Sequence, residues 1–272
     1  MADAFELGFI GAGNMAEGIV AAVIARGLYP AGAIVVSDPV PERRELFARR
    51  FGTAVAEDNR LLVRQSRRVV LSIKPQSFAE VAAGLADEVR ADQLWISIMA
   101  GIGTGKIAAA FPRVQARVVR VMPNLPIRAG AGIAGVFAGA HARSDDLADA
   151  RAIFDAGGGT VVVEEEGLLD AVTALSGSGP AYFYYFVESL VAGGVACGLS
   201  EADALKLAEH TCLGAARMMI ESGEPPAELR RKVTSKGGTT QAALEYMDAA
   251  GVGAALREAV RRAFERGREL GS

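Results

Sequence analysis

Cysteine and histidine are scarce in this chain, and their scarcity excludes several kinds of site. Cys197 and Cys212 are the only two cysteines among 272 residues, and they form no Cys-x-x-Cys or Cys-x-x-His pattern. Neither a disulfide framework nor a structural zinc site is indicated, and we expect a cytoplasmic protein that holds no metal. The two histidines, His141 and His210, lie in no motif, so the sequence offers no evident histidine base.

The chain also lacks a strong charge imbalance and an uninterrupted apolar run. Its net charge is -3, its pI is near 5.6, and no Lys/Arg cluster is interleaved with aromatics, so nucleic acid is not an expected partner. No targeting signal is visible at the N-terminus, where acidic residues occur. The most apolar window, residues 179–199, has Glu188 at its middle. It therefore predicts a buried helix and no membrane segment.

A glycine turn near the N-terminus is the most informative local pattern. Residues 5–18, FELGFIGAGNMAEG, combine an apolar strand, a tight turn and the start of a helix. Gly11 and Gly13 let the backbone turn sharply and approach a pyrophosphate, and the helix N-terminus offers free amides. This pattern predicts a dinucleotide-binding turn. The simpler alternative is a tight strand–helix turn that binds nothing.

Apolar strands alternate with helices as far as residue 164, and from residue 168 the hydrophobic period is helical throughout. This order is typical of a doubly wound α/β sheet followed by a helical domain. Two prolines within residues 122–126 predict a loop at the carboxyl end of a strand, where open α/β sheets bind ligands. We therefore expect a Rossmann-like α/β dinucleotide-binding domain over residues 1–164 and an all-α substrate-binding and dimerisation domain over residues 165–272.

The first long helix expected in the second half is apolar on every side for most of its length, beginning with YFYYFV at residues 182–187. Such a helix must be covered on all sides. A partner subunit related by two-fold symmetry is the simpler cover, and a central position in a compact bundle is the alternative. Two glycine-rich segments, residues 176–180 and 235–240, each precede a helix. They predict either sites for carboxylates or phosphates, or ordinary linkers with helix caps.

Five segments together resemble the pyrroline-5-carboxylate reductase family from end to end. They are GFIGAGNMAEG at residues 8–18, SIKP at 72–75, RVMPNLP at 120–126, ALSGSGPAYFYYFVESL at 174–190 and VTSKGGTTQAAL at 233–244. The resemblance implies a homodimer, with higher oligomers of dimers left open. It also implies reduction of 1-pyrroline-5-carboxylate to L-proline, the last step of proline biosynthesis, with NADPH or NADH.

The resemblance further implies which residues contact the two ligands. Cofactor contacts fall on Gly11, Gly13, Asn14, Met15, Ser37, Asp38, Asn59, Lys74, Pro75, Ala100 and Gly101, with Met122, Pro123 and Asn124 near the nicotinamide. Substrate contacts fall on Val233, Ser235, Thr239 and Thr240. Lys74, at a strand's carboxyl end, is equally well explained as a solvated surface lysine.

Hydride transfer to a cyclic imine asks for positioning more than for a strong base, which fits the absence of a histidine motif. We hypothesise that the amides of Gly238, Thr239 and Thr240 bind the substrate carboxylate. Thr240 would be the catalytic residue, its hydroxyl hydrogen-bonding the ring nitrogen, with proton relay left open. Lys236 occupies a position where the family commonly has proline. A lysine there loosens the loop and adds a charge.

Asp38 leaves the choice of cofactor open. An acid at this distance from the glycine turn usually binds an unphosphorylated adenine ribose, which favours NADH. Arg43 and Arg44, one turn into the next helix, are placed to reach a 2′-phosphate instead, and Asp38-Pro39 is also a common turn starter. Two rival functions remain at this point: a related imine or β-hydroxyacid dehydrogenase, and a cofactor-binding sensor without catalysis.

Overall fold

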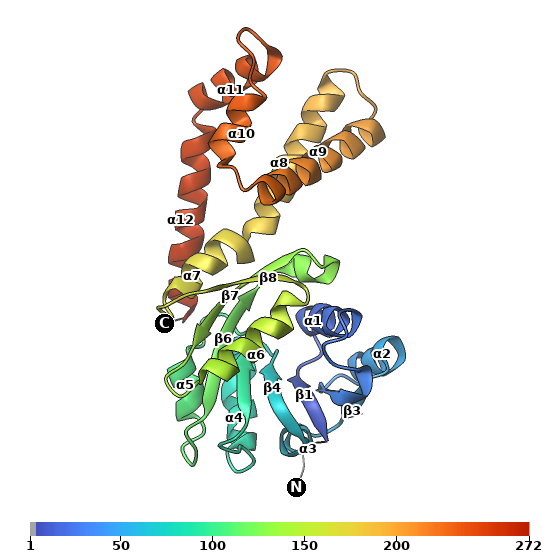
Figure 1. Cartoon of the computed structure of the whole chain (residues 1–272), viewed down its shortest axis with the longest axis vertical. Helices are drawn as coiled ribbons and strands as arrows, with labels where there is room; N and C mark the ends of the chain where they lie inside the picture. The colour runs from blue at the N-terminus through green and yellow to red at the C-terminus, as the bar shows by residue number, and fades with distance from the viewer. Residues whose placement is uncertain (1–3, 272) are drawn as a thin grey trace. The chain divides into compact units, whose positions relative to one another are not determined.

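The computed structural model describes residues 4–271, which fold into two compact units (Figure 1). The first unit runs to Ser178 and also includes the chain from Ala263 onward; the second comprises Gly179–Arg262. The sequence predicts a boundary at residues 164–165, earlier than this division. The difference arises because the first helical segment after residue 164 packs on the sheet, where a Cβ on Gly135 would meet the side chains of Val172 and Leu169.

An eight-stranded sheet in the order β3-β2-β1-β4-β5-β6-β7-β8 forms the centre of the first unit. Neighbouring strands are parallel except for β6 and β7, which are antiparallel. This confirms the expected doubly wound α/β sheet. The strands are β1 (Phe5–Ile10), β2 (Ile34–Ser37), β3 (Ala54–Ala56), β4 (Ser66–Leu71), β5 (Leu94–Ser97), β6 (Arg117–Pro123), β7 (Gly132–Ala138) and β8 (Gly158–Val162).

Helices cover both faces of this sheet. One core cluster joins Leu7 and Phe9 of β1 to Ile19 of α1, and the other joins Ile10 to Leu62 of α3. Both faces are apolar because the strands alternate between two helical layers and neither face meets water. The helices of this unit are α1 (Asn14–Ala25), α2 (Pro41–Phe51), α3 (Asn59–Gln65), α4 (Phe78–Leu85), α5 (Thr104–Ala109), α6 (Ser144–Asp155) and α7 (Leu168–Val172).

The antiparallel pair β6–β7 corrects one expectation about the segment 122–126. Met122 and Pro123 belong to β6 and pair with Gly135 and Ala134, so the loop begins only at Asn124. Proline is tolerated there because β5 ends opposite Arg120, which leaves Pro123 without a neighbour on that side. The short 3₁₀ turn η3 (Leu125–Ala129) then reverses the chain. It is too short for the crossover that a parallel strand would need.

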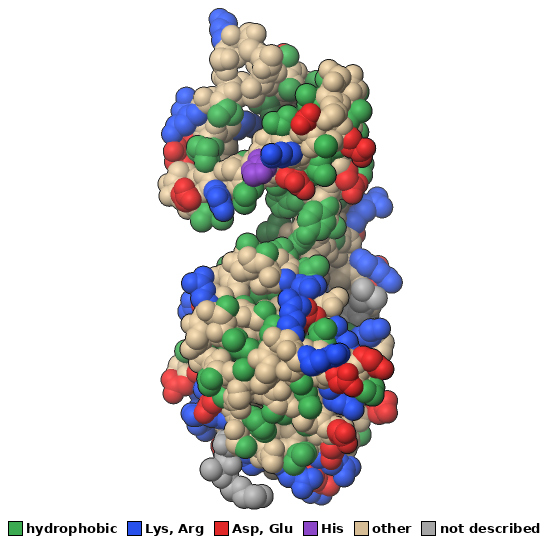
Figure 2. Space-filling view, turned by 90° about the vertical axis from the view of Figure 1, so that its right-hand side faces the viewer, with side chains coloured by type: hydrophobic (Ala, Val, Ile, Leu, Met, Phe, Trp, Pro, Cys, Tyr) green, Lys and Arg blue, Asp and Glu red, His purple; other side chains and the backbone are tan. Residues whose placement is uncertain are grey.

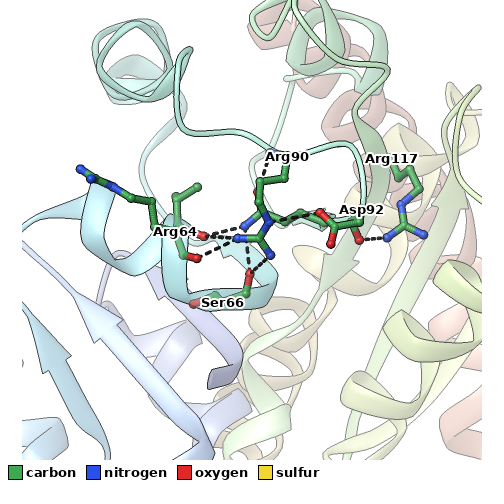
Figure 3. A network of polar contacts seen from close by, with 7 residues as sticks. Arg64, Ser66, Arg90, Asp92 and Arg117 are labelled. Carbon is green, nitrogen blue, oxygen red and sulfur yellow. Dashed lines mark hydrogen bonds and ion pairs between the residues drawn. The ribbon is translucent and has the colours of Figure 1, made fainter. Parts of the chain in front are cut away.

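Arg90 holds together the opposite, amino-terminal edge of the sheet (Figure 3). Its guanidinium donates to the carbonyl oxygens of Arg64, over 2.8 Å, and Ser66, over 3.5 Å, and to the Asp92 carboxylate over 3.1 Å. The carbonyl of Asp92 in turn accepts a hydrogen bond from Arg117 at the start of β6. These contacts join the amino ends of β4, β5 and β6, so the charged groups at this edge stabilise the sheet.

The second unit is helical, and no strand follows β8 in the part of the chain that is described, as expected. Among the described helices, none combines the length and apolarity needed to cross a bilayer. Its helices are α8 (Gly179–Ala196), α9 (Glu201–Ser222), α10 (Pro226–Lys232), α11 (Thr239–Ala249) and most of α12 (Val252–Gly271).

The single chain leaves many apolar side chains of these helices uncovered, and hydrophobic side chains reach the surface in Figure 2. Tyr185 on α8 is 72% exposed and Ile220 on α9 is 82% exposed. The compact-bundle alternative would bury α8 among its own neighbours, and that is not what is observed. The helical unit therefore does not cover its own apolar surface.

Candidate functional site

The residues implicated in cofactor binding follow the carboxyl ends of neighbouring parallel strands. Gly11 follows β1, Asp38 follows β2, Lys74 lies shortly after β4 and Ala100 shortly after β5. Because parallel strands end at one edge of a sheet, these residues gather there. The strand order changes direction between β1 and β4, the place where open α/β sheets form a ligand crevice.

The two glycines of the glycine turn have different explanations. Gly11 has φ +99°, and a Cβ there would lie 2.4 Å from the carbonyl oxygen of Ser72, so glycine is required by the fold itself. Gly13 is exposed, and a Cβ there would meet nothing within 4 Å. The fold therefore does not explain glycine at position 13, whereas a phosphate approaching the backbone would.

The start of α1 supplies donors for such a phosphate. Gly13 is the N-cap and makes no side-chain cap, and the first helical hydrogen bond runs from the Glu17 amide to the Gly13 carbonyl over 3.0 Å. The amides of Asn14, Met15 and Ala16 consequently have no helical acceptor. Together with the positive end of the helix dipole, they favour an anion at this point.

Ser37, Asp38 and Asn59 lie together where β2 ends. Both oxygens of the Asp38 carboxylate accept backbone hydrogen bonds, from the Ala12 amide over 2.8 Å and from the Val40 amide over 2.9 Å. The Ser37 hydroxyl donates to Asn59 Oδ1 over 2.5 Å and lies 3.4 Å from the Phe9 carbonyl oxygen. Hydrogen bonds therefore already hold Ser37, Asp38 and Asn59 in place where the adenosine of the cofactor is predicted to bind.

A buried carboxylate that the sequence reasoning missed lies behind this network. Glu17 of α1 is 5% exposed and pairs with Arg43 over 3.2 Å, with Arg128 over 3.3 Å and with Arg50. Its three partners come from α2 and η3, so Glu17 fastens both segments to the first helix. An acid among the apolar positions of a helix was the signal available in the sequence.

Lys74 and Pro75 lie beside the glycine turn. The Ser72 amide donates to the Ile10 carbonyl over 2.9 Å, which joins the chain after β4 to the end of β1. Lys74 is exposed, and Pro75 opens the 3₁₀ turn η2 (Pro75–Ser77). Ala100 and Gly101 form the turn after β5, with Gly101 at φ +72°. The structure thus brings all of these positions to one edge of the sheet.

Asn124 is buried, and both polar atoms of its side chain form hydrogen bonds within the fold. Its Oδ1 accepts from the Ile133 amide over 3.0 Å, and its Nδ2 donates to the Ser176 carbonyl over 3.2 Å. Met122 is partly exposed and Pro123 is buried. Asn124 therefore shapes the end of β6, and Met122 is the member of this trio with side-chain surface to offer.

The segment at residues 176–180 is not the loop that the sequence suggests. Residues Thr173–Gly177 form a π-helical turn, η4, and Gly179 already begins α8. The Ser178 amide donates to the Thr173 carbonyl over 2.8 Å, so it is not free for an anion. The helix α7 therefore continues through this π-helical turn toward α8.

The second glycine-rich segment, in the helical unit, keeps free donors. The Gly238 amide donates to the Ser235 carbonyl over 3.0 Å, so it already has an acceptor within the fold. The first helical bond of α11 runs from the Ala242 amide to the Gly238 carbonyl over 3.2 Å. The amides of Thr239 and Thr240 therefore have no helical acceptor. Val233, Ser235 and Thr239 are exposed and Thr240 is partly exposed.

Two family models match this chain. Residues 166–270 match the model described as pyrroline-5-carboxylate reductase dimerisation. Residues 6–101 match the model described as NADP oxidoreductase coenzyme F420-dependent.

Relatives match almost the whole chain. It is 42% identical over 266 residues to the pyrroline-5-carboxylate reductase of Synechocystis sp., covering 98% of both chains. It is 40% identical over 265 residues to that of Pseudomonas aeruginosa, covering 97% of this chain and 96% of the relative.

Solved structures show the same similarity in three dimensions. A pyrroline-5-carboxylate reductase from Coxiella burnetii superposes with a TM-score of 0.92 at 34% identity, covering 99% of this chain and 100% of that one. Pyrroline carboxylate reductase from Plasmodium falciparum, solved with NADP bound, superposes with a TM-score of 0.87 at 26% identity, covering 100% of both chains.

Proposed function

The chain belongs to the pyrroline-5-carboxylate reductase family, and from this premise we propose that it reduces 1-pyrroline-5-carboxylate to L-proline with NADPH or NADH. This is the last step of proline biosynthesis. The observation that carries the proposal is the full-length relationship to enzymes of this activity. The open Gly13 position at the start of α1 supports it, because a dinucleotide-dependent reaction needs such a phosphate site.

The reduced nicotinamide supplies a hydride when it is bound. We assign its pyrophosphate to the turn around Gly13 and the amides of Asn14 and Met15, and its adenine ribose to Asp38. Lys74, Pro75, Ala100, Gly101 and Met122 would line the path toward the nicotinamide along the carboxyl edge of the sheet.

The substrate carboxylate is assigned to the start of α11. The free amides of Thr239 and Thr240 and the positive end of this helix suit a carboxylate. Val233 and Ser235 flank this position. A Cβ on Gly238 would lie 2.4 Å from Ser235 Oγ, so glycine there keeps the turn closed. The role of Gly238 is to set the turn, while its neighbours bind.

Thr240 is the residue we assign to chemistry. Its hydroxyl would hydrogen-bond the ring nitrogen. That nitrogen is readily protonated, and its protonation makes the imine carbon electrophilic toward a hydride. Neither histidine of the chain is needed for this step. The protein's contribution is therefore orientation, together with a hydrogen bond at the nitrogen.

Self-association follows from the match to the dimerisation model, and we propose that the assembly is a homodimer. In this homodimer, the exposed apolar surface of the helical unit would form the interface between the two subunits. We also propose a cytoplasmic location, and a domain boundary at residues 164–165, close to where the dimerisation match begins at residue 166.

Purified protein tests the activity directly. We expect oxidation of NADH or NADPH that depends on added 1-pyrroline-5-carboxylate and yields one L-proline per dinucleotide. Thr240→Ala should lower kcat/KM for the imine at least about tenfold while leaving dinucleotide affinity unchanged, and Thr240→Ser should retain most activity. Dinucleotide binding without imine-dependent oxidation would contradict the proposed reaction.

A further inference from the structure

We propose that Asp38 makes this enzyme prefer the dinucleotide without a 2′-phosphate, NADH over NADPH. The inference rests on the proposed dinucleotide site and adds which of the two cofactors that site selects. It concerns the adenine ribose alone, because the two cofactors differ only by the phosphate on its 2′ position.

The Asp38 carboxylate is fixed in place before any ligand arrives. Its Oδ2 accepts from the Ala12 amide, within the glycine turn, and its Oδ1 accepts from the Val40 amide. These two bonds, of 2.8 and 2.9 Å, prevent the side chain from turning away from the end of β2. A carboxylate has about four lone-pair positions, so two remain to accept hydrogen bonds from ribose hydroxyls.

The nearby side-chain donors that could bind a phosphate already form hydrogen bonds within the fold. The Ser37 hydroxyl donates inward, to Asn59. Arg43 donates through Nε to the Ala12 carbonyl over 2.6 Å and through a terminal nitrogen to Glu17. Arg44 donates to the main-chain carbonyl of Asp38 over 2.5 Å.

The two arginines therefore brace the Asp38 network. Each bonds a carbonyl of the same two residues, Ala12 and Asp38, that are joined by the amide–carboxylate bond. These bonds hold the two guanidinium groups at the glycine turn and at the end of β2. We infer that they serve the Asp38 network and not a 2′-phosphate, the alternative that the sequence left open.

A fixed carboxylate beside the ribose discriminates by charge. It accepts hydrogen bonds from a 2′-hydroxyl, whereas a 2′-phosphate would bring two like charges within a few ångströms of each other. Water and salt screen that repulsion, so we expect a preference of at least about tenfold, with NADPH still usable at higher concentration.

Equilibrium binding is the primary test, because it needs no imine. Dissociation constants of NADH and NADPH are measured by nicotinamide fluorescence, and kcat/KM for each is measured in the imine assay. We expect NADH to bind at least about tenfold more tightly in the wild type. Asp38→Asn and Asp38→Ser, which remove the charge, should each reduce that ratio at least about tenfold.

Two further variants separate the proposal from its rivals. Glu45→Gln removes a negative charge from an exposed position of the same helix, α2, and should leave the ratio within about twofold. Arg44→Gln should weaken NADH and NADPH by the same factor, since its role is to brace the main chain. A selective loss of NADPH binding in Arg44→Gln would mean that Arg44 holds a 2′-phosphate.

The proposal is overturned if the wild type binds NADPH as well as or better than NADH, or if both Asp38 variants leave the ratio unchanged. It would stand if NADH were selected but no imine were reduced. That result would contradict the proposed function alone.

Discussion

The side-chain amide of Asn124 donates to the carbonyl oxygen of Ser176 over 3.2 Å and so ties the end of β6 to the π-helical turn before α8. Its other polar atom accepts from the Ile133 amide. Asn124 is 8% exposed, so little water reaches these two hydrogen bonds from its side.

Asn124→Ala should lower the free energy of unfolding by about 1–3 kcal/mol, because it removes two part-buried hydrogen bonds, each of which contributes about 0.5–1.5 kcal/mol. Urea denaturation measures the change, and Leu125→Ala at the exposed neighbouring position should cost no more than about 0.5 kcal/mol. Equal stability of the Asn124 variant and the wild type would show that these two hydrogen bonds contribute nothing.

Gly11 and Gly13 should respond oppositely to alanine. Gly13→Ala should leave stability within about 0.5 kcal/mol, since its Cβ would meet no protein atom, yet weaken dinucleotide binding at least about tenfold. Gly11→Ala should destabilise the fold by about 1–3 kcal/mol or more, because of its positive φ and the Ser72 carbonyl. Thermal unfolding and fluorescence titration distinguish the two effects. Unchanged dinucleotide affinity in Gly13→Ala would place the pyrophosphate elsewhere.

Lys236 should assist the capture of an anionic substrate, because its ammonium lies in the loop that leads to the free amides of α11. Lys236→Gln is expected to raise KM for the imine about threefold at low ionic strength, with kcat unchanged and the effect lost at high salt. Lys206→Gln, an exposed lysine on α9, is the matched control.

Lys236→Pro separates backbone from charge at the same position. It restores the residue common in the family while removing the charge. If the backbone dominates, this variant should match or exceed the wild type in kcat/KM. If the charge dominates, it should behave like Lys236→Gln. A KM for Lys236→Gln equal to that of the wild type at low salt would remove the electrostatic role.

The exposed apolar face of the helical unit should hold the homodimer together. Tyr185→Glu and Ile220→Glu would bury a charge in that interface, so the mass measured by light scattering should fall to 28.3 kDa, that of one chain. Leu61→Glu, at an exposed apolar position on α3, should stay dimeric. Dimers that persist in both helical variants would place the interface elsewhere.

Much of the fold was predictable from local patterns. The glycine turn, the alternation of strands and helices, and the purely helical second half follow from residue spacing, which sets local backbone geometry directly. The segments that misled were those whose conformation depends on a distant neighbour. Pro123 stays in a strand because β5 ends beside it, and residues 173–177 wind into a π-helical turn where the sequence suggested a loop.

The family, the reaction and the residues that gather at the carboxyl edge of the sheet could all be predicted from the sequence, because motifs and their spacing can be read without knowing any side-chain partner. How those residues are bonded became clear from the three-dimensional structure. It shows that Asn124 and Gly238 are bonded within the fold, that Gly13 is open, and that Arg43 and Arg44 brace the network around Asp38. Hydrogen-bond partners far apart in the chain are set by packing, which no local pattern encodes.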